Sequence, residues 1–348
     1  MPDTMKAAVM YGIDDIRIEQ VPMAQLAAPD WALVRIGAVG ICGSDIHFLE
    51  EGRIGCFVVE GPLILGHESA GTVVEVGAEV RGLAPGDRVA VEPGYPCRKC
   101  EFCKTGRYNL CADVTFLACP PTNGVFCEYL AWPADFLFKL PDNVSLEEGA
   151  MIEPFSVGLH AARRAGIRAG ETVAVLGSGP IGLCALQAAR ASGATTVIVA
   201  DLEQSRLDRA LGLGAGDVVN LREADPVEAI VGLTNGRGVD VVLECSGSVP
   251  ALQTAVRVAR RGGTVQLVGN FSVPEPNAPI QELIERELNL SGLFRYANCY
   301  GASVELIADG KVDTKSLITH RYSLDETLEA MRWVSHNKDK VIKGVIAP

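Results

Sequence analysis

The chain has 348 residues, which suggests two domains at about 150 residues each. Hydrophobic residues make up 48% and charged residues 21%, so the composition excludes a disordered or fibrous protein. With 31 Lys and Arg against 43 Asp and Glu the net charge is −12, which argues against a nucleic-acid partner or an anionic membrane surface.

The first 150 residues contain short runs rich in β-branched and aromatic residues, separated by turns containing glycine and proline. These runs are Lys6–Tyr11, Ile16–Val21, Trp31–Ile41, Gly71–Val76, Arg88–Glu92 and Cys127–Trp132. Short strands separated by turns are typical of an all-β domain, either a barrel or a sandwich. Inside this region, residues 97–111 are dense in cysteine and form a candidate lobe of their own.

From Glu171 onward, apolar runs of strand length alternate with helical patterns. The expected strands are Val173–Leu176, Val197–Ala200, Val218–Asn220, Val239–Leu243, Thr264–Val268 and Leu288–Leu293. Helices fit between them, for example over Pro180–Ala191 and Ser205–Leu213. Nearly continuous apolar strands indicate a parallel sheet that is buried on both faces, so this half is predicted to be a doubly wound α/β domain.

The longest uncharged run, Thr172–Ala189, has the length of a membrane span. Glycines and a proline interrupt its middle, so a strand, a turn and a buried helix explain it better. No long apolar segment follows Lys6, and the 11 cysteines are odd in number, so we expect no secretory signal, reduced thiols and a cytoplasmic protein. The tail is predicted to form helices over Ser303–Asp309 and Asp325–Val334 and a strand over Val341–Ile346.

A glycine-rich turn follows the first strand of the α/β region. The segment Gly177-Ser178-Gly179-Pro180-Ile181-Gly182 fits the pattern G-x-G-x-x-G and opens a helix. Such a turn lets the backbone approach a pyrophosphate, and the helix N-terminus offers free N–H groups. Asp201 ends the next strand, where a carboxylate accepts hydrogen bonds from a ribose diol and repels a 2′-phosphate. The pattern therefore favours NAD over NADP, with Arg206 one turn later as a candidate neighbour of the adenosine.

Two groups of residues have the chemistry of metal ligands. Cys97, Cys100, Cys103 and Cys111 are closely spaced among charged residues, which predicts a closed, structural zinc site. The second group is dispersed and consists of Cys42, His67, Glu68 and Glu153. Mixed sulfur, nitrogen and oxygen ligands with one open position are typical of catalytic zinc. Spacing alone leaves this group open, since Cys42 and His67 could equally be core residues.

These motifs together resemble the zinc-containing medium-chain alcohol dehydrogenases, and within them the sorbitol and xylitol (polyol) dehydrogenases. The resemblance rests on Gly40–His47, Gly66-His67-Glu68, the four cysteines, Ile152–His160, the glycine-rich turn and Gly292–Tyr296. It implies a GroES-like, β-rich catalytic domain over residues 1–155, a Rossmann domain over 156–293, and a return to the catalytic domain over 294–348. It also implies two zinc ions per chain, NAD, and a homo-oligomer, either a dimer or, as the preferred expectation, a homotetramer.

The resemblance further implies roles for individual residues. Cys42, His67 and Glu68 would hold the catalytic zinc, with Glu153 as a carboxylate beside it or as the alternative third ligand. Ser44 with His47, or Glu153 through a water, would carry the released proton. Phe48, Phe116, Arg295 and Tyr296 would line the substrate site, and Val268, Gly269 and Phe294 would join the turn residues at the cofactor. Phe48 stands where animal sorbitol dehydrogenases are expected to have tyrosine, which leaves the identity of the sugar alcohol open.

The expected reaction is the reversible oxidation of a secondary hydroxyl of a polyol to a ketose, with hydride transfer to NAD. The alternatives are another zinc-dependent secondary-alcohol dehydrogenase, of the 2,3-butanediol or threonine type, or a zinc-ribbon scaffold that retains a nucleotide domain. The net charge and the second ligand group disfavour the scaffold.

Overall fold

The computed structural model describes residues 2–271 and 273–348, and the chain divides into two compact units. Unit 1 contains the chain up to Glu153 together with Tyr300–Asp309 and Thr314–Pro348. Unit 2 contains Pro154–Cys299 and Gly310–Asp313. Helix α4 (Ile152–Ala165) begins in the first unit and continues in the second.

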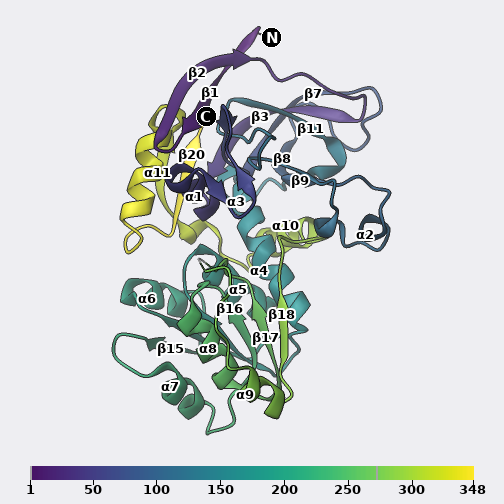
Figure 1. Cartoon of the computed structure of the whole chain (residues 1–348). Helices are drawn as coiled ribbons and strands as arrows, with labels where there is room; N and C mark the ends of the chain where they lie inside the picture. The colour runs from purple at the N-terminus through teal and green to yellow at the C-terminus, as the bar shows by residue number, and fades with distance from the viewer. Residues whose placement is uncertain (1, 272) are drawn as a thin grey trace. The chain divides into compact units, whose positions relative to one another are not determined.

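The central feature of unit 1 is a seven-stranded sheet in the order β12-β8-β7-β3-β20-β19, in which β11 also pairs with β3 (Figure 1). The strands are β3 (Trp31–Gly40), β7 (Glu68–Val76), β8 (Arg88–Val91), β11 (Tyr129–Pro133), β12 (Leu137–Lys139), β19 (Ile318–Ser323) and β20 (Lys343–Ala347). The C-terminal strand β20 pairs antiparallel with β3 at Val345 and Gly40. This pairing brings the end of the chain beside the segment that leads into Cys42.

Smaller elements complete unit 1. β1 (Thr4–Gly12), β2 (Asp15–Pro22) and β6 (Leu63–Ile64) form a three-stranded sheet, and two-stranded pairs join β4 (Arg53–Ile54) with β5 (Phe57–Val58) and β9 (Gly94–Tyr95) with β10 (Thr115–Phe116). The helices are α1 (Gly43–Glu51), α2 (Glu101–Lys104), α3 (Leu146–Ala150), α10 (Tyr300–Ala308) and α11 (Thr327–His336). The expected β-rich domain is therefore present, although sequence patterns did not predict α1.

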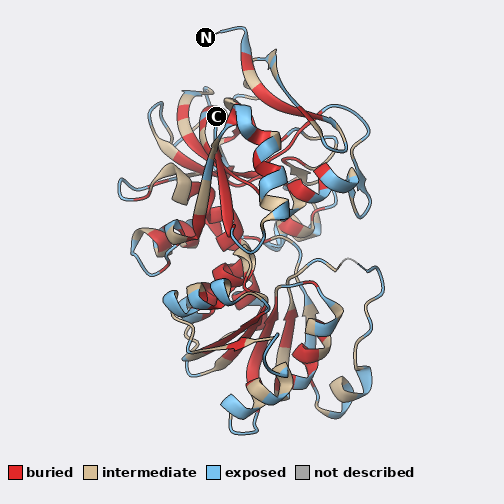
Figure 2. Cartoon of the chain, turned by 90° about the vertical axis from the view of Figure 1, so that its left-hand side faces the viewer, coloured by how far each residue is buried: buried red, intermediate tan, exposed pale blue. Residues whose placement is uncertain are grey.

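Unit 2 is built on a parallel six-stranded sheet in the order β15-β14-β13-β16-β17-β18. The strands are β13 (Thr172–Leu176), β14 (Thr196–Asp201), β15 (Asp217–Asn220), β16 (Val239–Glu244), β17 (Ala259–Leu267) and β18 (Asn289–Gly292). The helices between them are α5 (Pro180–Ala191), α6 (Gln204–Gly212), α7 (Pro226–Leu233), α8 (Val249–Val258) and α9 (Ile280–Glu285). The inner strands are buried and several helices expose their outer faces (Figure 2).

The strand order of this sheet reverses between β13 and β16. In doubly wound sheets, ligands bind outside the carboxyl ends of the strands at such a switch point. The predicted α/β class is confirmed, and the uncharged run Thr172–Ala189 forms β13 and α5. Within residues 2–271 and 273–348, no helix combines the length and apolar character needed to cross a membrane.

Candidate metal centres and nucleotide-binding turn

The strand register of unit 1 brings the dispersed metal ligands together. Cys42 caps the N-terminus of α1, just after β3, and Glu68 opens β7 directly after His67. Because β3 and β7 pair with Gly40 opposite Glu68, the two chain segments meet at this point. One ligand atom from each of Cys42, His67 and Glu68 lies within 4.8 Å of the others. The dispersed ligands Cys42, His67 and Glu68, whose spacing alone was not decisive, thus form a compact group of three donors.

Glycine is needed at position 40 because of the close approach of Glu68. A Cβ atom on Gly40 would lie 2.1 Å from the Glu68 Oε2 atom. Any larger residue would therefore displace this carboxylate from the ligand group.

A buried lysine holds the Glu68 carboxylate. Lys343 Nζ donates to both Glu68 oxygens at 2.7 Å and to the Ile41 carbonyl at 3.1 Å. The two side chains are 3% and 1% exposed, so this ion pair is removed from water. Lys343 had no predicted role, although a single charge inside the apolar run Val341–Ile346 was a usable signal.

Asp45 was quoted in a motif but given no role, and it connects the two ligand segments. Its carboxylate accepts hydrogen bonds from the Cys42 N–H at 2.9 Å and the Gly66 N–H at 3.0 Å, and lies 3.8 Å from His67 Nδ1. Asp45 is fully buried. A carboxylate behind a metal-binding histidine orients the ring and increases its basicity.

The charge of this group suits a cation. Burial lowers the pKa of His67, but the Cys42 thiolate and the Asp45 and Glu153 carboxylates outweigh it and raise that pKa to about 10. Sulfur, imidazole and carboxylate donors with buried acidic neighbours form the donor set that zinc takes in catalytic sites. Cys42, His67 and Glu68 therefore fit a zinc ion.

The other predicted residues of unit 1 differ in their surroundings. Ser44 and His47 lie one turn apart on α1, and the His47 side chain is 57% exposed and 3.4 Å from Glu51. Glu153 is buried, but it is not within the three-residue ligand group. The Phe116 ring lies 5.7 Å from that of His67. Phe48 is buried in the hydrophobic core of unit 1.

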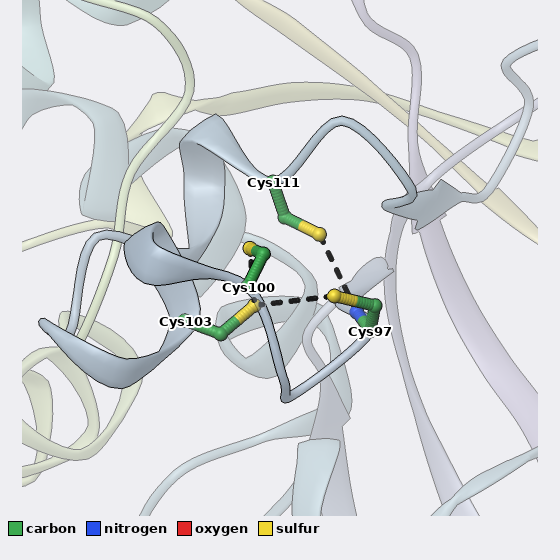
Figure 3. A group of neighbouring side chains, drawn as sticks. All are labelled: Cys97, Cys100, Cys103 and Cys111. Carbon is green, nitrogen blue, oxygen red and sulfur yellow. Dashed lines mark hydrogen bonds between the residues drawn. The ribbon is translucent and has the colours of Figure 1, made fainter.

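The four closely spaced cysteines point their sulfur atoms toward one another (Figure 3). The Sγ atoms of Cys97 and Cys103 are 3.9 Å apart, and those of Cys100 and Cys103 are 3.3 Å apart. A tetrahedral zinc site with bonds of 2.3 Å has sulfur–sulfur edges of about 3.8 Å. Backbone N–H groups of Lys99 and Cys100 lower the pKa of Cys97 to about 6. This geometry fits a closed, structural zinc site.

Polar contacts fix the cysteine lobe to the sheet of unit 1. The Tyr108 hydroxyl, from the lobe, donates to the buried Glu92 carboxylate at 2.6 Å, and burial raises the pKa of Glu92 to about 7. Arg98 donates to Asp135 at 2.7 Å. These contacts hold the lobe against the rest of unit 1.

We expect the Cys100→Ser variant to lose stability rather than chemistry. A structural zinc site supplies folding energy, so losing about 2 kcal/mol should lower the melting temperature by about 5 °C. The turnover per folded site should stay within about twofold, with Cys56→Ser, an exposed cysteine, as the control. Thermal melts with parallel activity measurements check this. A fully stable variant without activity would contradict the structural assignment.

In unit 2, the glycine-rich turn lies between β13 and α5, and Gly179 is the N-cap of the helix. Gly177 has a φ of 93°, and a Cβ on Gly182 would lie 1.8 Å from the Gly177 carbonyl oxygen, so both positions require glycine. Pro180 and Ile181 form the first turn of α5. The Asp201 carboxylate accepts hydrogen bonds from the Ser178 N–H at 2.5 Å and the Glu203 N–H at 2.9 Å.

Further residues lie beside the glycine-rich turn at the switch point, and only some of them were predicted from the sequence. Arg206 Nη1 lies 3.9 Å from the position of a Cβ on Gly179, which places this cation beside the turn rather than at the adenosine alone. The N–H groups of Val268 and Gly269 donate to the Glu244 carbonyl at 2.8 and 2.9 Å. The Glu244 carboxylate, which had no predicted role, accepts bonds from Ser246 and Gly247, the loop beside Gly177.

The remaining predicted residues lie at the end of unit 2. Arg295 has a φ of 52° and its guanidinium lies 4.8 Å from the ring centre of Phe294, which is 49% exposed. Tyr296 is buried. Their predicted roles toward substrate and cofactor stay predictions.

Two family models match the chain. The alcohol dehydrogenase GroES-like domain matches residues 28–142, and the zinc-binding dehydrogenase domain matches residues 180–309. The chain is 48% identical over 348 residues to the sorbitol dehydrogenase of Bacillus subtilis, an alignment that covers 100% of this chain and 98% of that protein.

Two solved structures are also similar. An Escherichia coli oxidoreductase of unknown specificity has a TM-score of 0.95 at 38% identity, with 99% of each chain covered. A zinc-binding dehydrogenase of Sinorhizobium meliloti, bound to NADP, has a TM-score of 0.91 at 33% identity, with 100% of each chain covered. The chain therefore belongs to the zinc-containing medium-chain alcohol dehydrogenases, as a zinc-dependent oxidoreductase similar to sorbitol dehydrogenase.

Proposed function

We propose that this protein oxidises a secondary hydroxyl of a polyol of the sorbitol or xylitol type to a ketose and reduces NAD. The observation that carries the proposal is the joint presence of the Cys42, His67 and Glu68 donor group and the glycine-rich turn followed by Asp201. Likeness to a sorbitol dehydrogenase over the whole chain supports the choice of substrate class. We also propose that the catalytic domain ends at residue 155, that the Rossmann domain covers residues 156–293, and that the chain returns to the catalytic domain from residue 294.

Cys42, His67 and Glu68 would hold the catalytic zinc, and the four cysteines of the lobe a second ion. When bound, the catalytic zinc lowers the pKa of an alcohol oxygen. Glu68 is favoured over Glu153 as the third ligand because it is the carboxylate within the donor group. Phe116 would line the substrate site beside His67, and Phe48, Arg295 and Tyr296 keep their predicted substrate roles.

The released proton needs a route to water. Ser44 and His47 lie three positions apart on α1, hence on the same face of the helix, and the His47 ring is exposed. Glu153 is buried, so it would need a further carrier to reach solvent. This difference favours the route through Ser44 and His47.

The cofactor would lie at the carboxyl ends of β13, β14 and β16. The free N–H groups at the start of α5 and the Arg206 guanidinium would bind the pyrophosphate. Asp201 would accept hydrogen bonds from the adenosine ribose. Val268, Gly269 and Phe294 keep their predicted places at the cofactor.

The decisive experiment follows NADH formation with sorbitol, xylitol, galactitol, 2,3-butanediol and L-threonine, with and without a zinc chelator. The proposal expects the fastest turnover with a polyol, its loss on chelation, and two zinc ions per chain by metal analysis. Turnover only with 2,3-butanediol or L-threonine would move the protein to the alternative substrate class. One zinc and no turnover would support the scaffold.

We expect Asp201→Ala to weaken NADH binding about tenfold and to reduce the preference over NADPH, because a charge-assisted hydrogen bond to the ribose is lost. Fluorescence titrations of both cofactors check this. Asp208→Ala, which removes an exposed acid on α6, is the matched control. An unchanged NADH to NADPH ratio would remove Asp201 from the ribose site.

We further propose a homotetramer and a cytoplasmic location. β18 is an edge strand of its sheet, and Leu290 on it and Ile280 and Ile284 on the nearby α9 are exposed, a combination that favours pairing with a second copy. None of the eleven cysteines, all of which lie in the described part of the chain, is joined in a disulfide, and such cysteine usage is typical of a reducing compartment. Light scattering should give four times 36.9 kDa in solution. Leu290→Asp should lower that mass, and an unchanged assembly would exclude this edge.

A further inference from the structure

The loop after β15 folds onto the turn after β14, at the carboxyl edge of the unit 2 sheet. Asn220 pairs with Asp201 in the strand register, and the Leu221 N–H donates to the Asp201 carbonyl at 2.9 Å. The Asn220 side chain also donates to Gln204 at 3.0 Å. These contacts hold the two loops together beside Asp201.

This arrangement brings a cation next to the predicted ribose carboxylate. Arg222 Nε donates to the Leu202 carbonyl at 2.8 Å, and Arg222 Nη2 donates to the Glu203 carboxylate at 2.5 Å. The two residues that directly follow Asp201 in the sequence, Leu202 and Glu203, are not basic. Only the pairing of β14 with β15 places an arginine from the following loop at this position.

The chemistry of this group bears on cofactor choice. NADP differs from NAD by a 2′-phosphate on the adenosine ribose, and an arginine near the acidic residue after the second strand accommodates that phosphate. The guanidinium fork is suited to a phosphate. In this chain, however, the fork already faces a carboxylate, and Asp201 adds a second negative charge beside it.

We propose that Arg222 is a specificity-determining residue that Glu203 keeps neutralised. With Glu203 in place, the two acids outweigh the single cation, and a ribose with a free 2′-hydroxyl is selected. Without Glu203, Arg222 becomes available to a 2′-phosphate. This inference rests on the proposed use of NAD.

The ion pair between Arg222 and Glu203 is exposed to solvent, so Arg222 should be easily freed when Glu203 is removed. The side chains of Arg222 and Glu203 are 61% and 34% exposed, and ion pairs at such positions contribute little to stability. Removing Glu203 should therefore leave the fold intact, while the Leu202 carbonyl still orients the guanidinium. The matched control is Glu282, which pairs with Arg257 at 3.2 Å elsewhere on unit 2, with both side chains similarly exposed.

The experiment titrates NADH and NADPH into the zinc-loaded full chain and follows tryptophan fluorescence. Glu203→Ala should bind NADPH about tenfold more tightly than the unsubstituted protein, the gain expected from one charge-assisted contact to a phosphate, while its NADH affinity stays within about twofold. The double variant Glu203→Ala, Arg222→Ala should lose the whole gain. Glu282→Ala should change neither affinity.

Other results would contradict this inference, the proposed function, or both. If Glu203→Ala gains no affinity for NADPH, or if the gain survives in the double variant, Arg222 is not the determinant, although the proposed function stands because NADH still binds. If the unsubstituted protein binds neither cofactor, the proposed function fails, and this inference fails with it. Tighter binding of NADPH than NADH by the unsubstituted protein would overturn the proposed use of NAD, and this inference with it, while the polyol substrate class would still be decided by turnover.

Discussion

The Cys42→Ser variant is expected to lose turnover by at least about a thousandfold while it still binds NADH. Cys42 is the only sulfur in the Cys42, His67 and Glu68 donor group, and a neutral hydroxyl is a much weaker zinc ligand than a thiolate. A bound zinc contributes several kcal/mol to stabilising charge in the transition state, which corresponds to this loss of rate.

Three measurements separate a catalytic effect from misfolding in this variant. Metal analysis should show one zinc lost per chain, the NADH affinity should change less than twofold, and the melting temperature should show that the protein is folded. Cys56→Ser is the matched control, because Cys56 is exposed and outside both metal groups. Retained turnover in Cys42→Ser would falsify the catalytic role of this cysteine.

Replacing Lys343 by methionine should lower the stability of the protein more than Cys100→Ser does. The substitution leaves the Glu68 carboxylate buried without its ammonium partner, and breaking a buried ion pair in this way costs about 3–5 kcal/mol. For a unit of this size, we expect the melting temperature of the zinc-free protein to fall by about 10 °C. The loss should be smaller in the zinc-loaded protein, because a cation beside Glu68 replaces part of the missing charge.

A double-mutant cycle identifies the cause. Glu68→Gln combined with Lys343→Met removes both charges and should recover much of the lost stability, and Lys340→Met, at an exposed lysine just before β20, should cost little. If the single and double variants melt together, Lys343 is needed for packing and not for balancing the charge of Glu68.

Local chemistry in the sequence was sufficient for several conclusions. The four cysteines are close in the chain, so their spacing alone predicted a group that the structure shows with sulfur atoms 3.3 and 3.9 Å apart. The glycine-rich turn was also predictable, because its conformation depends on adjacent residues and on the strand and helix that flank it. The parallel sheet was predictable because its strands are nearly continuous apolar runs in the sequence.

The sequence by itself therefore determined the fold class, the cysteine lobe and the nucleotide-binding turn, because each could be predicted from patterns of residues that lie close together in the chain. The tertiary structure decided what residue spacing left open. The β3–β7 register brings Cys42 and Glu68 together, which only the family resemblance had implied, Lys343 returns from the C-terminus to hold Glu68, and Arg222 reaches the turn after β14. Strand pairing brings residues together over long sequence distances, and a one-residue slip would separate them, so no local pattern encodes these contacts.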